Sequence, residues 1–325
     1  MEDKAINVPE EYPGKPITVI VPVTAGGSPD LAVRIMAKAA AKYLGQPLFV
    51  TNVPGGGATT GWNELAGSKP DGYTLGAIAT GIILQTLYGP VKYHYPTALA
   101  PLAHIGSLPV VAAVLADQPW QNIDDLVKFA QEHPGALKFG HMGLGSPVHA
   151  VGEMFAKQAG IDIVQVPFDG GVEVVTSLAE GHTQLAFIDY SQVKDYVKNS
   201  KVRVLALAAE QRLTVPLFKD VPTFKEQGLD IVMDLWLGVG APKGLPEVVK
   251  DKLAAGLEAI IHDADVVKNM ADWGIMLEYL GPQEFTAKWL ADNARLAKAV
   301  KETGIAERIV MQKNAAAGIL VGGDR

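Results

Sequence analysis

Short apolar runs alternate with amphipathic stretches over the first 80 residues of the chain. Residues 17–21 are apolar and rich in β-branched side chains, a pattern typical of a buried strand. The predicted strands cover residues 17–21, 48–53 and 73–79. The first predicted helix is capped by Ser28, starts at Pro29 and runs to about residue 44, and the second ends near residue 66. Strands that alternate with helices in this way predict a parallel sheet with helices on both faces.

The same alternation recurs in the middle of the chain, from about residue 106 to residue 230. Strands are predicted at 137–141, 163–166, 183–188 and 202–208, and helices at 123–132, 147–159 and 171–181. After an apolar run at residues 235–240 the chain is largely helical, which suggests material packed back onto the first part. We therefore expect two α/β lobes, one formed by residues 1–105 and 235–325 and the other by residues 106–234.

Composition excludes several classes of function. The 325-residue chain is 48% hydrophobic with a formal net charge of −7, which is typical of a folded globular protein. Its acidic balance argues against a nucleic-acid partner, because such partners select basic surfaces. The absence of cysteine excludes disulfides and cysteine-ligated metal sites. The sequence contains no run of about 18 apolar residues, so no membrane span is predicted.

The N-terminal segment, residues 1–11, is polar and lacks the apolar core of a signal peptide. Two interpretations follow from the residues alone. Either the protein is cytosolic, or the numbering starts after a signal peptide that has been removed.

Two loops share one local design, and each connects a predicted strand to a predicted helix. Gly27-Ser28-Pro29 opens the first helix, and Gly145-Ser146-Pro147 opens a helix of the second lobe. Serine is a good N-cap, and proline suits the first helical position. The first amides of a helix lack internal partners and lie at the positive end of its dipole, so such a start can hold an anion. If the lobes face each other, both loops border one cleft. The alternative interpretation is that Gly-Ser-Pro is simply a good helix start.

Further candidate ligand contacts lie near the ends of other strands. The loop at Phe168-Asp169-Gly170 is a third candidate wall of the cleft, and Thr80 follows the third predicted strand. Asp189 ends a strand and either reaches the cleft or caps a loop. His149, in the first turn of its helix, either faces the cleft or makes a local structural contact. Trp236 is either a pocket wall or a core residue.

Known catalytic and cofactor patterns do not fit this chain. The Gly55-Gly56-Gly57 turn opens a helix, but its spacing departs from the dinucleotide fingerprint and no acidic residue ends a strand about 20 residues later. None of the seven histidines has the spacing of a zinc site. Ser146 and His149 lack a third partner, so no hydrolase triad is predicted. We expect no catalytic residue, no metal and no cofactor.

Several short motifs occur along the chain in a characteristic order. They include Tyr12-Pro-Gly-Lys-Pro16, Ala25-Gly-Gly27 with Asp30 and Arg34, Asn52-Val-Pro-Gly-Gly56, Lys69-Pro-Asp-Gly-Tyr-Thr-Leu75, Gly143-Leu-Gly-Ser146 with His149, Val166-Pro-Phe168 and Val221-Pro-Thr223. By their order and spacing, from Tyr12 to about Ile305, the chain resembles the solute-binding proteins of tripartite tricarboxylate transporters, also called the Bug family. The resemblance implies a type II periplasmic-binding fold. Two α/β lobes, each a sheet flanked by helices, are joined by two crossover strands, with the ligand in the cleft between them.

The resemblance also implies a function. Proteins of this family hold a small carboxylate with the loops that match residues 22–28 and 143–149, partly through water. They are exported to the periplasm and deliver the ligand to a membrane transporter, and we expect this chain to do so as a monomer. A dicarboxylate is our first choice of ligand and an aromatic acid our second. The alternatives are a sensory binding module and, with less support, a small-molecule enzyme.

The chain departs from the family pattern at the predicted pocket. Val23-Thr24 replaces an aromatic residue and a proline, Phe168 replaces a frequent tyrosine, and Ala150 replaces the leucine that usually follows the histidine. The identity of the ligand is therefore the property that transfers least. The residues expected to contact it are Val23, Thr24, Ala25, Gly26, Gly27, Ser28, Thr80, Gly143, Gly145, Ser146, His149, Phe168, Asp169, Gly170, Asp189 and Trp236.

Overall fold

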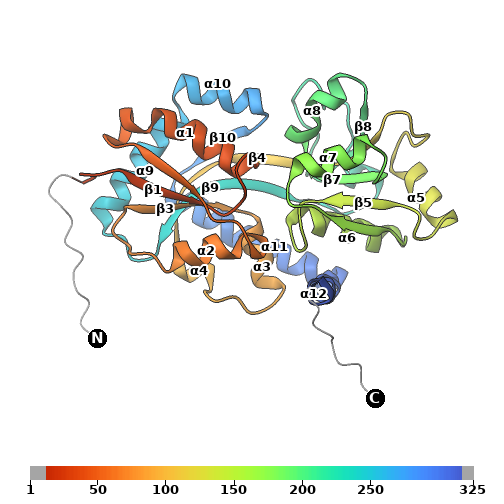
Figure 1. Ribbon diagram of the computed structural model, residues 1–325, viewed down its shortest axis with the longest axis horizontal. Helices are drawn as coiled ribbons and strands as arrows, with labels where there is room; N and C mark the ends of the chain where they lie inside the picture. The colour runs from red at the N-terminus through yellow and green to blue at the C-terminus, as the bar shows by residue number, and fades with distance from the viewer. Residues whose placement is uncertain (1–11, 317–325) are drawn as a thin grey trace, which may run out of the picture. The chain divides into compact units, whose positions relative to one another are not determined.

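The computed structural model describes residues 12–316, and these residues form two compact units (Figure 1). The first unit contains the chain up to Thr86 and the segments Pro90–Ser107 and Trp236–Arg295. The second unit contains Leu87–Gly89, Leu108–Leu235 and the chain from Leu296 onward. The predicted first lobe included residues 235–325, so the placement of its last segment differs. The parts of that prediction that concern residues 1–11 and 317–325 lie outside the described residues.

The first unit is built around a sheet whose centre is β1 (Ile17–Val21). β1 pairs in parallel with β2 (Leu48–Asn52) and β3 (Thr74–Ala79), and β3 pairs antiparallel with β9 (Asp234–Pro242). The helices of this unit are α1 (Ser28–Leu44), α2 (Thr59–Ala66), α3 (Gly81–Leu87), α4 (Tyr95–Ala98), α9 (Glu247–Ile261), α10 (Ala264–Trp273) and α11 (Pro282–Thr303), of which α3 and α11 run on into the second unit. The three parallel strands place residues 22–28, 53–57 and 80–81 at the same edge of the sheet.

The second unit has its own sheet, with β5 (Lys138–His141) between β6 (Val164–Pro167) and β7 (Leu185–Asp189). These three strands are parallel, whereas β4 (Leu99–Leu115) runs antiparallel to β7 and to β8 (Val202–Leu207). The helices are α5 (Ile123–Glu132), α6 (Pro147–Ala159), α7 (Gly171–Ala179), α8 (Tyr190–Lys198) and α12 (Ile305–Ala316). The mixed α/β architecture predicted from the sequence is confirmed.

Two strands connect the units, as the family resemblance led us to expect. β4 begins in the first unit and ends in the second, and β9 begins in the second and ends in the first. The pattern of the sequence was assigned no strand over residues 99–115, where Pro101, Gly106 and Pro109 interrupt the apolar run. Pairing with β7 and β8, and with β10 (Met276–Leu280), overrides this local signal.

The contacts of helix α12 explain why this segment belongs to the second unit and not to the predicted first lobe. Its Ile305 and Ile309 side chains are buried, and Arg308 and Gln312 bond to a side chain of α6. Both side chains contact Glu153, which lies more than 140 residues before them in the chain. No periodicity within a single helix signals contacts of this kind.

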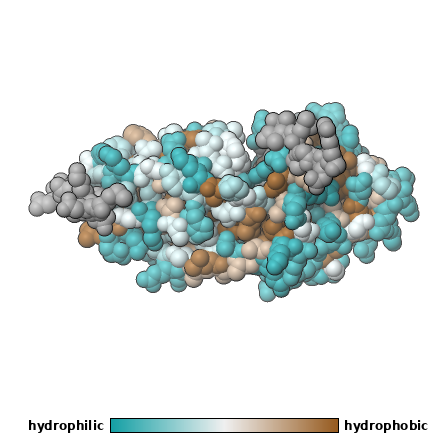
Figure 2. Space-filling model, turned by 90° about the horizontal axis from the view of Figure 1, so that it is seen from below, coloured by the Kyte–Doolittle hydropathy of each residue, from teal (hydrophilic) through white to brown (hydrophobic). Residues whose placement is uncertain are grey.

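Aromatic side chains form the cores of both units. Trp236 packs against Phe285 and Trp289 in the first unit, and Phe139 packs against Phe187 in the second. The face of the molecule in Figure 2 is largely hydrophilic or intermediate, with apolar residues in patches between. No helix within residues 12–316 combines the length and apolar character needed to cross a bilayer.

Close packing of α9 on α1 makes Gly256 a sensitive position. A Cβ atom at Gly256 would lie 2.2 Å from Cδ2 of the buried Leu44. We expect Gly256→Leu to reduce the free energy of unfolding by about 1–3 kcal/mol through overpacking. Ala255→Leu is the matched control, because Ala255 is exposed on the same helix and should change stability by about 0.5 kcal/mol or less. Equal stability of the two variants in urea denaturation would contradict this assignment.

Candidate functional site

The first predicted loop follows β1 and presents Thr24, Ala25 and Gly26 to solvent. α1 begins at Ser28, and its N-cap is Gly27 in an extended conformation (φ −68°, ψ 157°). The prediction that Ser28 caps this helix is therefore wrong, because Ser28 already belongs to the helix. No side chain caps the helix at Gly27.

Asp30 holds this loop in place from the first turn of α1. Its buried carboxylate accepts hydrogen bonds from the Gly26 amide at 2.9 Å, from Nε of Arg34 at 2.8 Å and from Nδ2 of Asn52 at 2.8 Å. Burial alone would raise the pKa of Asp30, but the bonds from Arg34, Gly26 and Asn52 outweigh it and lower that pKa. The carboxylate is thus a charged anchor for the loop.

The second predicted loop follows β5 and leads into α6. Ser146 is the N-cap of α6, as predicted, and its hydroxyl accepts a hydrogen bond from the His149 amide at 3.3 Å. The His149 ring is fully buried. Its Nδ1 accepts a hydrogen bond from the Gly145 amide at 3.0 Å, so in the neutral ring the proton lies on Nε2, 3.3 Å from Oε1 of Glu153.

The two loops are anchored with the same spacing. In the first, the Gly26 amide bonds to Asp30, and Asp30 bonds to Arg34. In the second, the Gly145 amide bonds to His149, and His149 pairs with Glu153. Each step covers four residues, and residues four apart lie on one face of a helix. The similarity of the loops seen in the sequence thus extends to side chains four and eight residues further on.

This geometry changes which amides are available to a ligand. The amides of Gly26 and Gly145, two residues expected to contact the ligand, are occupied by Asp30 and His149. Within residues 12–316, the amides of Thr24, Ala25 and Leu144 make no hydrogen bond to the protein. These three are among the loop donors that an anion can use.

A second buried histidine, His141, contacts the second loop. The His141 ring stacks on His149 with 4.2 Å between centroids, and its Nδ1 lies 3.0 Å from the carbonyl oxygen of Gly143. Its Nε2 lies 2.6 Å from the side-chain amide of Gln165. Burial, with a smaller electrostatic contribution from the adjacent His149, lowers the pKa of His141 to about 4. His141 is therefore neutral near pH 7.

The other predicted residues of the second unit lie at the same edge of its sheet. β5, β6 and β7 are parallel, so their carboxyl ends place the loops at residues 142–146, 168–170 and 189 together. Phe168 is half-buried and Asp169 is exposed. Asp189 is buried at the start of α8 and accepts a hydrogen bond from the Ser191 hydroxyl. Its carboxylate makes no N-cap bond to α8.

Thr80 and Trp236 have structural contacts in the first unit. The Trp236 amide donates to the Thr80 hydroxyl at 2.9 Å, and both side chains are buried. The Trp236 ring packs edge-on against Phe285 with 5.2 Å between centroids. Of the two interpretations left open by the sequence, the structure places this tryptophan in the core of the unit.

Sequence reasoning missed three groups that surround the second loop. Nε of Arg308 lies 2.6 Å from Oε2 of Glu153, and Nε2 of Gln312 donates to Oε1 of Glu153 at 2.9 Å. Burial would raise the pKa of Glu153, but His149, Gln312 and Arg308 together lower it. The third group is Lys313, which packs against Gly145. All three lie on α12, about 155 residues or more from their partners along the chain, so no local motif marks them.

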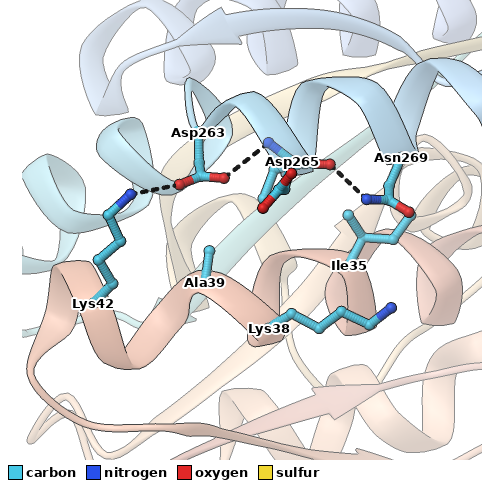
Figure 3. Close-up of a pocket in the computed structure, with 8 residues that line it drawn as sticks. Ile35, Lys38, Ala39, Lys42, Asp263, Asp265 and Asn269 are labelled. Carbon is cyan, nitrogen blue, oxygen red and sulfur yellow. Dashed lines mark hydrogen bonds and ion pairs between the residues drawn. The ribbon is translucent and has the colours of Figure 1, made fainter.

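The groove in Figure 3 lies elsewhere, between α1 and α10 of the first unit. Lys42 and Asp263 form an ion pair across it at 2.9 Å. It contains none of the predicted site residues. Within residues 12–316, no cluster of three or more histidine, aspartate or glutamate side chains is arranged to hold a metal ion.

Comparison with known proteins identifies the family. The model of the tripartite tricarboxylate transporter family receptor matches residues 32–305. The chain belongs to this family. The receptor is 30% identical to protein BugT of Bordetella pertussis over 303 residues, which cover 91% of both chains. The resemblance to the Bug family is thereby confirmed.

Solved structures similar to this receptor include two with bound dicarboxylates. One is a Rhodopseudomonas palustris protein with adipate, with a TM-score of 0.82 and 26% identity, covering 90% of the receptor and 99% of that chain. The other is MatC from the same species with malate, with a TM-score of 0.75 and 28% identity, covering 92% of the receptor and 100% of that chain. The two-lobed fold expected for this receptor is that of these relatives.

The buried His141 makes the receptor's stability sensitive to pH. The unfolded chain takes up a proton on this residue below about pH 6.5, whereas the native state resists protonation until about pH 4. Native stability should therefore fall as pH is lowered through this window. From pH 6.5 to pH 5 the loss due to His141 should be about 2 kcal/mol, since one pKa unit corresponds to about 1.36 kcal/mol.

His141→Asn tests this, because an asparagine amide can still donate to the Gly143 carbonyl but does not titrate. Urea denaturation at both pH values should show a smaller loss for His141→Asn than for the unmutated chain. His182→Asn replaces an exposed histidine of the same unit and serves as the control. The same pH dependence in all three proteins would be inconsistent with a buried neutral His141.

Proposed function

We propose that this receptor captures a small carboxylate in the periplasm and delivers it to a membrane transporter, as a monomer and without catalysing a reaction. The observation that carries the proposal is the matched anchoring of the loops at residues 22–28 and 143–149. In each, a buried side chain fixes the loop from within its helix. Amides of Thr24, Ala25 and Leu144 remain as donors for an anion.

We propose that the ligand contacts both loops, which lie in different units. Membership of the tripartite tricarboxylate receptor family supports this arrangement, because it makes the chain a solute-binding protein of a two-lobed class. A dicarboxylate is the preferred ligand class, and an aromatic acid is second. Adipate and malate in the similar structures support the first choice.

The remaining predicted contact residues are assigned different roles in this proposal. Val23, Gly27, Ser146, Phe168 and Gly170 line the loops and are proposed to shape the pocket. Thr80, Asp189 and Trp236 are buried, so their proposed role is to support the pocket wall. The structural roles of Gly26, Gly145 and His149 favour positioning of the loops over direct contact.

A thermal-shift screen tests the ligand class. Adipate, malate, benzoate and acetate each enter at millimolar concentration. A ligand present at a hundred times its dissociation constant should stabilise the fold by about 2.7 kcal/mol and raise the melting temperature by several degrees. Sucrose at equal osmolarity controls for general stabilisation. If no carboxylate shifts the melting temperature, the proposal is wrong.

A second prediction concerns the first loop. Thr24→Asp places a negative charge beside the available amides of Thr24 and Ala25 without disturbing a buried contact, since Thr24 is exposed. Repulsion should weaken binding of the carboxylate found in the screen by about tenfold or more, which corresponds to about 1.4 kcal/mol. Thr214→Asp, an exposed loop threonine of the second unit, is the matched control. Calorimetry that shows equal affinity for both variants would remove the first loop from the site.

A further inference from the structure

The C-terminal helix α12 packs beside α6 in the second unit (Figure 1). The match to the family model ends at residue 305, where α12 begins. Almost all of this helix therefore lies outside the part of the chain that carries the family signature.

Glu153 fixes the position of α12 on α6. Its side chain is fully buried and pairs with Arg308 at 2.6 Å and with Gln312 at 2.9 Å. Removing the partners of a buried carboxylate strongly destabilises a protein. The ion pair with Arg308 and the hydrogen bond from Gln312 therefore resist sliding or rotation of the helix. Lys313 follows Gln312 directly and is held in place by the same anchors.

Lys313 lies against the second loop. A Cβ atom built at Gly145 would lie 2.6 Å from Cε and 2.7 Å from Nζ of Lys313. Gly145 also has a positive φ of 79°, a conformation that favours glycine in this turn. The Nζ atom lies 5.2 Å from the centre of the Tyr88 ring, at the distance of a cation–π contact.

The arginine that supports the anchor of each loop is already paired with a carboxylate. Arg34 is paired with Asp30 and Arg308 with Glu153, so neither brings a net positive charge to its loop. Burial lowers the pKa of Lys313, which indicates an ammonium group partly removed from water. In such surroundings an ionised carboxylate gains more from a cation than it does in bulk solvent.

We propose that Lys313 is a ligand-binding residue, and that its ammonium group pairs with the ionised carboxylate held at the second loop. The inference rests on the proposed function, since it assigns a cation to the same site. It adds a cationic side chain to a site otherwise built from backbone amides. It also makes α12 part of the binding site.

Calorimetric titration with adipate and with malate tests this. Lys313→Met should weaken binding by about ten- to a hundredfold, the range for loss of a charge-assisted hydrogen bond. Lys313→Arg keeps the charge and should retain most of the affinity. Lys301→Met removes the same charge from an exposed position of the second unit and should bind as the unmutated chain does.

A second readout separates charge from packing. Affinity of the unmutated chain should fall as salt is raised from 20 to 500 mM, and this dependence should be weaker in Lys313→Met than in Lys301→Met. Unchanged affinity in Lys313→Met, or an unchanged salt dependence, overturns the inference while the proposed function stands. If the unmutated chain binds no carboxylate, the proposed function fails and the assignment of Lys313 fails with it.

Discussion

One hydrogen bond determines the shape of each predicted binding loop. In each loop a buried side chain accepts a hydrogen bond from the amide of a glycine four residues before it. Asp30 does this for Gly26, and His149 does it for Gly145. Without the acceptor, the amide would lose a partner and the turn its constraint, at a cost of about 1–3 kcal/mol. The positions of the amides left for a ligand, those of Thr24, Ala25 and Leu144, follow from this bond.

The two anchors differ in how far their support reaches. Asp30 is held by its neighbours on α1 and β2, so the first loop is a local structure. His149 is held by Glu153, and Glu153 is held by α12, so the second loop depends on the last helix within residues 12–316. The second loop therefore connects the proposed carboxylate site to a segment outside the family match.

Most of the regular structure was predictable because its signals are local. The helix at Ile123–Glu132 is amphipathic, is capped by Asn122 and has the bounds read from the sequence. Gly45 and Gly160 end their helices in left-handed conformations, as expected of glycine at these positions. Strand β4 was missed because pairing partners on both sides stabilise it despite its prolines. The cap at Ser28 was wrong because Gly27 takes that position.

By itself, the sequence determined the fold class, the family and the two loops, since strand, turn and helix-start signals involve neighbouring residues and motif order is written in the chain. Only the tertiary structure decided which loop amides are occupied, that Trp236 belongs to a core, and that Lys313 lies against Gly145. The first two depend on side-chain direction and packing, and the third on a contact between segments more than 150 residues apart. Such contacts form because α12 buries Ile305 and Ile309 and supplies partners to Glu153, which no local pattern records.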